Sequence, residues 1–263
     1  MTYSEPDVAA QISAALDSAD DGAGFTPEQT GLLDQFHAGG VGAVDKLIAT
    51  LAVSQGDRVI DVGSGFGGPA RRVAEQTGAI VVGVDITPAY VEAAEALTAR
   101  MGFADRVSFQ IADIMDMAVT EPFDAAMTMH VQMNVEDKQT WFAAIRNVLA
   151  PGARLAVWEV CANTERQPAW PMPWSLDGSD SFLVSSDDLR QSITAAGFDE
   201  LKWSDETAWV NDWSATVLPD GVPRPGLALP MVIDDGITRV VNFATALRDG
   251  TVSVMRGSFR RAG

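Results

Sequence analysis

The chain has 263 residues, of which 47% are hydrophobic, so it is long enough for one large α/β domain with an elaboration or for two small domains. Its formal net charge of −18 at pH 7 argues against a surface for nucleic-acid phosphates or for an anionic membrane, since both require clustered lysine and arginine. The only cysteine, Cys161, excludes an intramolecular disulfide and a four-cysteine zinc site, and with only two histidines, His37 and His130, we expect no metal.

Residues 1–31 form an acidic leader, and no lysine or arginine precedes Lys46. The leader lacks the basic segment and following apolar run of a secretory signal. No run in the chain approaches the ~20 apolar residues that a membrane-spanning helix needs. We therefore expect a cytoplasmic protein.

A strand, a glycine-rich turn and a helix start follow one another at residues 58–78. The β-branched run 59–62, which contains Asp61, predicts a buried strand. Glycines stand at 63, 65, 67 and 68, and Pro69 suits the first turn of a helix that ends at Gly78. This arrangement predicts a site for a nucleotide-bearing ligand, because glycines admit close approach and N–H groups at a helix start lack partners.

The turn fits two patterns. Counted from Asp61 it reads acid-x-Gly-x-Gly-x-Gly, and counted from Gly63 it also satisfies the dinucleotide pattern G-x-G-x-x-G. A glycine-rich turn without any ligand is the third interpretation. The segments that follow decide between them.

Strands and helices alternate after this turn. Apolar runs at 79–85, 107–113, 123–130 and 154–160 predict four further strands, with helical patterns between most of them. The continuous apolar run at 79–84 suits a parallel sheet covered on both faces. The alternation predicts an α/β protein with a doubly wound, mostly parallel sheet and helices on both faces.

The pattern changes beyond Cys161. Prolines within 167–174 exclude a regular helix or a central strand there. Ser185 is predicted to cap a helix, a strand is expected from 198 to 207, and residues 209–230 read as a loop or lid. A last helix at about 237–247 and a closing strand at 251–255 complete the chain.

Charged and polar residues stand at successive strand ends. Asp61, Asp85, Asp113, His130 and Glu159 lie in or directly after the five predicted strands. Ligands of open parallel sheets bind beyond the carboxyl ends of the strands, so these side chains can reach one crevice. Each acid taken singly could be a solvated strand end or a helix cap, but the ordered set favours a ligand site.

Two of the acids favour a ligand with an ammonium group. Asp85 comes about 20 residues after the glycine turn, where an acid accepts hydrogen bonds from ribose hydroxyls. Asp61 would repel a pyrophosphate and would attract an ammonium group. Asp113 can meet the exocyclic amine of an adenine, and Ile114 or Ile86 can pack on its ring.

The ordered motifs resemble those of class I S-adenosylmethionine (SAM)-dependent methyltransferases over about residues 56–160. They are DVGSGFG at 61–67, VDIT at 84–87, ADI at 112–114 and LAPG at 149–152. The resemblance implies SAM as cofactor and a Rossmann-like, seven-stranded sheet whose last strand inserts antiparallel. The residues that it assigns to SAM are Gln35, Asp61, Gly63, Ser64, Gly65, Gly67, Asp85, Ile86, Asp113, Ile114 and His130.

A narrower resemblance extends over about residues 32–208. The segments DQFHAGG at 34–40, GGPAR at 67–71, HVQMN at 130–134 and WPMPW at 170–174 are similar to bacterial sarcosine/dimethylglycine N-methyltransferase-like proteins. The resemblance implies a methyltransferase domain over 32–263 that acts on a nitrogen, or an oxygen, of a small molecule. A homodimer is left open.

The acceptor decides which catalytic groups are needed. A free amine needs little acid–base help, because the sulfonium is already a good leaving group and orientation supplies most of the rate. A hydroxyl needs a general base, for which His130 is the first candidate and His37 and Glu159 are reserves.

Residues 162–235 are expected to shape the acceptor pocket. Their indole rings can attract an alkylammonium group, or they can simply pack a lid and exclude water. The residues predicted to contact substrate are Phe36, Gln132, Trp170, Trp174, Trp209 and Trp213. We also predict that the segment 35–37 folds over bound SAM about a hinge at Gly39 and Gly40, with a fixed packing role for Phe36 as the alternative.

Two other functions remain as alternatives. A nicotinamide-dependent oxidoreductase would use the second glycine pattern, but no Tyr-x-x-x-Lys pair occurs and the only tyrosines are Tyr3 and Tyr90. A non-catalytic SAM-binding protein would share the same cofactor site. Methyl transfer from labelled SAM separates that binder from an enzyme.

Overall fold

The computed structural model describes residues 34–163, 166–218 and 234–263, so the predicted leader lies outside the described residues. The strands are β1 (Arg58–Val62), β2 (Ile80–Asp85), β3 (Val107–Ile111), β4 (Phe123–Met129), β5 (Leu149–Ala162), β6 (Phe198–Asp205) and β7 (Val252–Arg261). The helices are α3 (Gly40–Leu51), α4 (Gly68–Thr77), α5 (Pro88–Arg100), α6 (Lys138–Val148), α7 (Ser186–Ala195), α8 (Thr207–Val217) and α9 (Gly236–Arg248), with short 3₁₀ helices η1 (Ile114–Asp116) and η2 (Gln132–Asn134).

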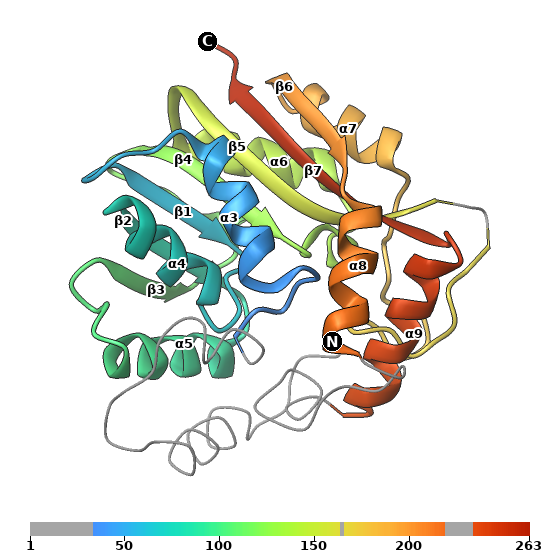
Figure 1. Ribbon diagram of the computed structural model, residues 1–263. Helices are drawn as coiled ribbons and strands as arrows, with labels where there is room; N and C mark the ends of the chain where they lie inside the picture. The colour runs from blue at the N-terminus through green and yellow to red at the C-terminus, as the bar shows by residue number, and fades with distance from the viewer. Residues whose placement is uncertain (1–33, 164–165, 219–233) are drawn as a thin grey trace.

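The strands of the described residues form one seven-stranded sheet in the order β3-β2-β1-β4-β5-β7-β6 (Figure 1). Strands β1 to β5 pair in parallel, and β7 runs antiparallel to both β5 and β6. The predicted doubly wound sheet with an antiparallel last strand is confirmed. The order reverses between β1 and β4, and at such a switch point the carboxyl ends of the strands leave a crevice for a ligand.

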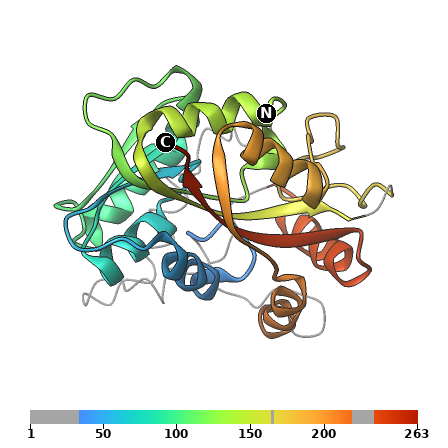
Figure 2. The ribbon, with the colours of Figure 1, turned by 90° about the horizontal axis from the view of Figure 1, so that it is seen from above.

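Each face of the sheet carries its own apolar core. One core joins the sheet to α3, α4 and α9, and the other joins it to α6 and α7. Figure 2 shows α6 and α7 on one side of the sheet, with α3, α4 and α8 on the other. Side chains alternate between the cores along a strand, so that Trp158 enters the α3 side and its neighbour Val157 the α6 side.

Local sequence sets several helix boundaries as expected. Helix α4 has Pro69 in its first turn and ends at the left-handed Gly78, which donates its N–H to Ala74 O. The hydroxyl of Ser185 accepts a hydrogen bond from the N–H of Asp188 and so caps α7, as predicted. Among the described residues no helix has the length and apolar character that a membrane crossing requires.

One element differs from the prediction. Residues 209–217, expected to begin a loop or lid, lie in helix α8, which has Val210 and Ser214 on its buried side. The prolines that suggested a loop begin only at Pro219, outside the described residues, and the stretch before them contains no helix breaker. The closing strand β7 is also longer than expected, because it continues to Arg261 between β5 and β6.

Candidate active site

The glycine turn joins β1 to α4 in a conformation that only glycine adopts easily. Gly63 has φ 75° and Gly67 has φ 74°. A Cβ atom at Gly63 would lie 2.4 Å from Val131, and one at Gly67 would lie 2.3 Å from Phe109. These two positions therefore require glycine for both backbone conformation and space, and the turn lies directly against the end of β4.

Two polar side chains of the turn region are buried and find no partner in the part of the chain that the structure describes. They are the Oδ2 atom of Asp61 and the hydroxyl of Ser64, and both residues are less than 5% exposed. Burial, together with the nearby charge of Asp85, raises the pKa of Asp61 to about 8, while Arg71 acts in the opposite direction. Buried polar groups are normally paired, so these two atoms fit a ligand that brings hydrogen-bond donors to the turn.

Asp85 connects the glycine turn to the end of β2. Its carboxylate accepts hydrogen bonds from the N–H of Gly65 (2.9 Å) and from the N–H of Thr87 (2.9 Å). Burial raises the pKa of Asp85, and these backbone donors oppose the rise. Each carboxylate oxygen has more than one acceptor position, so the side chain can also receive ribose hydroxyls. Beside it, Ile86 is 52% exposed and offers an apolar surface.

Asp113 and Ile114, which follow β3, differ in their surroundings. Asp113 caps η1 by accepting the N–H of Met115 at 2.9 Å. Ile114 is only 3% exposed and belongs to the core on the α6 side, whereas Met115 is 48% exposed. Of the two isoleucines predicted to pack on an adenine, Ile86 therefore presents its side chain and Ile114 does not.

The segment that precedes α3 docks against the glycine turn. Arg71 and Asp34 form an ion pair at 2.8 Å in which neither side chain is exposed. Arg71 also donates to Phe66 O and to the hydroxyl of Thr98. A Cβ atom at Gly68 would lie 2.5 Å from the backbone oxygen of Asp34. Sequence reasoning missed this pair, although DQ at 34–35 and R at 71 lie within two of the motifs quoted above.

Aromatic rings continue this docking. Phe36 lies 4.4 Å from the ring of Phe66 and 5.6 Å from that of Tyr90, measured between centroids. The buried pair of Asp34 and Arg71 fixes the same segment to α4. These contacts favour the packing alternative for Phe36 over a hinged lid.

Two histidines meet at the end of β4. His130 adopts a left-handed backbone (φ 55°), and its N–H donates to Trp158 O at 2.9 Å. Its ring lies 6.2 Å from that of His37, which in turn is hydrogen-bonded to Gln35 Oε1 at 2.7 Å. The Nε2 atom of His130 is buried and has no hydrogen-bond partner among the described residues. A strained backbone and an unpartnered ring nitrogen are features that functional residues often show.

Burial keeps both imidazoles neutral. It lowers the pKa of His37 to about 4, and it lowers the pKa of His130 well below its usual value, with repulsion from His37 adding to the effect. A neutral imidazole can accept a proton, but a lowered pKa makes it a weak base.

Glu159 holds the turn that follows β4. Its carboxylate accepts hydrogen bonds from the hydroxyl of Thr128 (3.1 Å) and from the N–H groups of Val131 (3.0 Å) and Gln132 (3.2 Å). The residue is fully buried, and burial raises its pKa to about 8. These three donors give Glu159 a positioning role toward the turn that carries His130. The same turn leaves Gln132 Oε1 buried without a partner.

A wall of aromatic rings leads away from His130. The ring of Phe243 on α9 lies 6.0 Å from His130 and 5.9 Å from Trp174, and Trp170 lies 6.4 Å from Trp174. Two of the predicted substrate residues, Trp170 and Trp174, thus continue a row of packed rings that starts at the candidate base, in which Trp174 and Phe243 are buried. Sequence reasoning missed Phe243, because α9 is distant in the chain and its helical spacing gives no sign of what it faces.

The other two predicted tryptophans lie elsewhere. Trp209 and Trp213, both on α8, pack against the start of α3: a Cβ atom at Gly39 would lie 2.7 Å from Trp209, and one at Gly40 would lie 3.4 Å from Trp213. Lys46 also lies over the ring of Trp209, 4.6 Å from its centroid. The structure therefore gives both rings packing contacts with α3. Within the described ranges, no group of three acids, histidines or cysteines could hold a metal ion.

Comparison with known proteins agrees with this geometry. A family model described as a methyltransferase domain matches residues 53–197, which is more than half of the chain. The chain therefore belongs to the methyltransferase domain family.

Among relatives, the O-methyltransferase resE of Aspergillus sclerotiorum is 29% identical over 163 residues, 60% of each chain. The methyltransferase GfsG of Streptomyces halstedii is 26% identical over 220 residues, 82% of this chain and 77% of that protein. The chain thus spans less than two thirds of the length of the first of these relatives.

Solved structures share the fold. Geranyl diphosphate C-methyltransferase from Streptomyces coelicolor A3(2), in complex with Mg²⁺, geranyl-S-thiolodiphosphate and S-adenosyl-L-homocysteine, gives a TM-score of 0.70 at 16% identity over 99% of this chain and 95% of that one. The [4+2]-cyclase SpnF gives 0.65 at 23% identity over 84% and 80%. A protein of Galdieria sulphuraria, provisionally described as a sarcosine dimethylglycine methyltransferase, gives 0.59 at 15% identity over 84% and 83%.

Proposed function

We propose that the chain transfers the methyl group of SAM to a nitrogen, or to an oxygen, of a small-molecule acceptor by in-line displacement. The observation that carries the proposal is the unpartnered, buried carboxylate oxygen of Asp61 beneath a glycine turn whose backbone is held by Asp85. An ammonium group beside Asp61 and ribose hydroxyls beside Asp85 would satisfy both acids, and SAM carries both groups. Its sulfonium supplies an activated methyl group when it is bound.

The residues around this site have distinct roles in the proposal. Asp61 binds the ammonium group, Ser64 donates or accepts one further hydrogen bond, and Asp85 binds the ribose. Ile86 covers the adenine. Asp113 is the proposed partner of the adenine amine. Gln35 is the proposed contact at the methionine end of the cofactor, because its Nε2 atom is buried without a partner among the described residues and its Oε1 atom is hydrogen-bonded to His37.

The electrostatics of the acceptor side favour an amine over a hydroxyl. The attacking atom forms a bond to the methyl carbon while the carbon–sulfur bond breaks, and a proton leaves the product. A neutral amine attacks through its lone pair and needs no base before the transfer. A hydroxyl needs one, and the lowered pKa of His130 makes that residue a weak base. Glu159 is occupied by its three donors.

The narrower assignment to a sarcosine/dimethylglycine-like group is part of this proposal. It is supported by the four segments of sequence and by a distant structural neighbour described in that way. The relatives named above include an O-methyltransferase, so oxygen stays as the second acceptor. A homodimer and a cytoplasmic location also remain predictions.

Two measurements test the proposal. Isothermal titration should show binding of SAM and of S-adenosylhomocysteine, and no binding of NAD; NAD binding without SAM binding would restore the oxidoreductase alternative. Labelled methyl-SAM, incubated with a panel of small amines and alcohols, should then label at least one of them. This second step is needed because the same fold is found in a cyclase. SAM binding with no acceptor labelled across the panel would favour the non-catalytic alternative.

A further inference from the structure

Arg239, in the first turns of α9, is a buried cation that has no carboxylate partner among the described residues. The residue is 2% exposed, and its Nε atom has no hydrogen-bond partner. Within the described part of the chain, its side chain makes one hydrogen bond, from Nη1 to Pro173 O over 3.4 Å, near the limit for such a contact. Among residues 34–163, 166–218 and 234–263, no acid forms an ion pair with it.

A second buried arginine shows the partners that a guanidinium finds elsewhere in this protein, although its Nε atom, like that of Arg239, has no hydrogen-bond partner among the described residues. Arg71 is fully buried and meets Asp34 at 2.8 Å, Phe66 O at 2.7 Å and the hydroxyl of Thr98 at 2.8 Å. A guanidinium stays charged at any ordinary pH, so a buried one needs such partners. Arg239 has five N–H donors and, among the described residues, a single weak acceptor for them, so its hydrogen-bonding capacity is largely unused.

The start of α9 provides a second, independent feature of an anion site. Asp235 stands at the N-cap without forming a side-chain hydrogen bond, so the described residues provide no side-chain cap for the first N–H groups of this 13-residue helix. Side chains in helices point back toward the N-terminus, which brings the guanidinium of Arg239 over this first turn. The helix dipole destabilises a cation at this end of the helix. An anion there is stabilised by the dipole and by the guanidinium. Asp234 and Asp235, the nearest acids in sequence, are exposed.

Arg239 lies on the acceptor side of the candidate active site. Four residues further along α9, about 6 Å along the axis, Phe243 contacts both His130 and Trp174. Asn242 donates to Pro171 O, so α9 is fixed against the same 170–175 segment that Arg239 touches. An anionic group at Arg239 would thus sit one helical turn from the ring that contacts His130.

We propose that Arg239 binds a carboxylate or phosphate group of the methyl acceptor, so that the acceptor is a small amine or alcohol that carries an anion. The inference rests on the proposed methyl transfer and adds the substrate class. The first N–H groups of α9 complete the anion site, and the ring of Phe243, four residues further along the same helix, contacts both His130 and Trp174.

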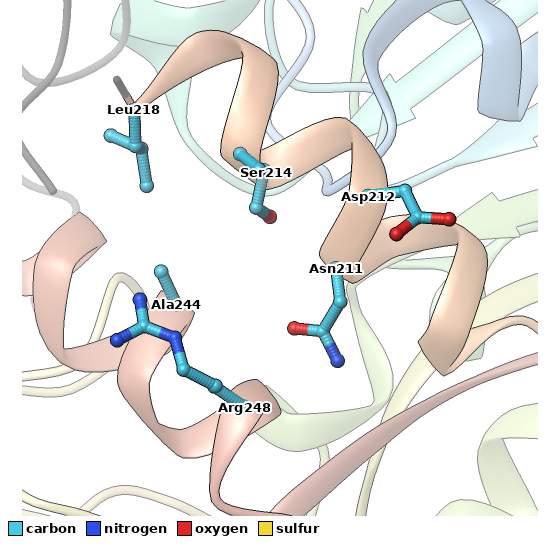
Figure 3. Close-up of a pocket in the computed structure, with 7 residues that line it drawn as sticks. Asn211, Asp212, Ser214, Leu218, Ala244 and Arg248 are labelled. Carbon is cyan, nitrogen blue, oxygen red and sulfur yellow. The ribbon is translucent and has the colours of Figure 1, made fainter. Parts of the chain in front are cut away.

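A second arginine on the same helix provides a matched control. Arg248, at the other end of α9, is exposed and borders a separate cavity of about 470 Å³ between α8 and α9. Figure 3 shows Asn211 and Ser214 of α8 across this cavity from Ala244 and Arg248. A cation at a helix C-terminus is stabilised by the dipole and needs no anion. Replacing Arg248 therefore removes the same charge from the same helix without touching the proposed site.

The first test measures anion binding directly. Wild type, Arg239→Met, Arg239→Lys and Arg248→Met are saturated with S-adenosylhomocysteine, and sodium acetate or inorganic phosphate is titrated at constant ionic strength. Tryptophan fluorescence and melting temperature report binding. We expect saturable binding to the wild type and to Arg248→Met, weakened on the order of 10- to 100-fold in Arg239→Met and less in Arg239→Lys. The anion that binds more tightly, acetate or phosphate, indicates whether the acceptor carries a carboxylate or a phosphate group.

Equal binding by Arg239→Met and the wild type, or no saturable binding to either, would overturn the inference. If Arg239→Met does not fold, Arg239→Lys decides, because it keeps the charge but loses the planar fork.

The second test separates this inference from the proposed function. Matched pairs of amines, with and without a carboxylate or phosphate, are offered with labelled SAM. A preference for the anionic member of at least tenfold that disappears in Arg239→Met supports the site. Methyl transfer that is equally fast for both members refutes it and leaves the methyltransferase intact. Failure of the wild type to bind S-adenosylhomocysteine would instead refute the proposed function.

Discussion

Binding of SAM should release a proton from Asp61. Binding brings the ammonium group of SAM close to the Asp61 carboxyl. Burial, with the nearby charge of Asp85, raises the pKa of this carboxyl to about 8 from an ordinary value of 3.8. At pH 7 such a group is protonated in about 0.9 of the molecules, and in about half of them if the pKa is one unit lower. The ammonium favours the ionised form, so the proton leaves on binding.

The magnitude follows from the same pKa. Ionising this carboxyl at pH 7 costs about 1.4 kcal/mol, which lowers the apparent affinity for SAM about tenfold relative to a site that is already ionised. Between pH 6 and 7.5 the logarithm of the association constant should therefore rise by nearly one unit per pH unit. Above that range the α-amino group of SAM itself loses its proton, and the rise should stop.

Titration calorimetry in buffers of different ionisation enthalpy measures the proton directly. We expect 0.5 to 0.9 proton released per SAM at pH 7, as estimated above from the pKa. Asp61→Asn, which keeps shape and cannot ionise, should release none and bind SAM roughly 10- to 100-fold more weakly. An unchanged proton count in Asp61→Asn, or no release from the wild type, would refute the reasoning.

The sign of the stability effect is a further check. Because the folded pKa of Asp61 is raised, its contribution to the free energy of unfolding is fully present below about pH 4 and is lost as pH rises through about 8. Ligand-free Asp61→Asn should then be more stable than the wild type at pH 8, by at least ~1 kcal/mol. Urea unfolding with and without SAM measures both effects.

Four further outcomes are expected. Asp85→Ala should weaken SAM by roughly 1–3 kcal/mol in calorimetry, since the ribose and the N–H groups of Gly65 and Thr87 lose their acceptor; an unchanged dissociation constant would remove Asp85 from the site. Methyl transfer should be unaffected by EDTA, and activity lost with EDTA and restored by Mg²⁺ would show a metal-assisted reaction. Asp34→Asn should lower the free energy of unfolding by ~3–5 kcal/mol, because it leaves the buried guanidinium of Arg71 uncompensated. Removing residues 1–38 deletes the same Asp34 and should therefore lower the melting temperature of the ligand-free protein. An unchanged melting temperature would identify the segment 35–37 as the hinged lid. Because the pKa of His130 is lowered, protonation of this residue should reduce the rate of methyl transfer only below pH 6.5. A loss of rate that His130 causes with a midpoint at or above pH 6.5 would mean that its pKa is not lowered.

Much of the fold follows from local patterns in the sequence. Strand runs alternate with helical patterns, and this order permits little other than a doubly wound sheet. Once the strands are parallel, their carboxyl ends meet at one edge, which is why Asp61, Asp85 and His130 could be placed near one another before their contacts were known. The prediction of a loop where helix α8 lies was wrong, because the loop that the prolines from Pro219 onward indicate was extended to the residues before them.

The sequence alone therefore determined the sheet, the glycine turn and the order of the acids, since each depends on residues that are neighbours in the chain. Only the tertiary structure decided which partners those residues find. Asp34 pairs with Arg71 across 37 positions, Glu159 holds the turn after β4 from the next strand, and Trp209 packs on α3. Arg239 remains without an acid among the described residues, a fact that depends on every segment packed around α9 and that no periodicity along the chain could reveal.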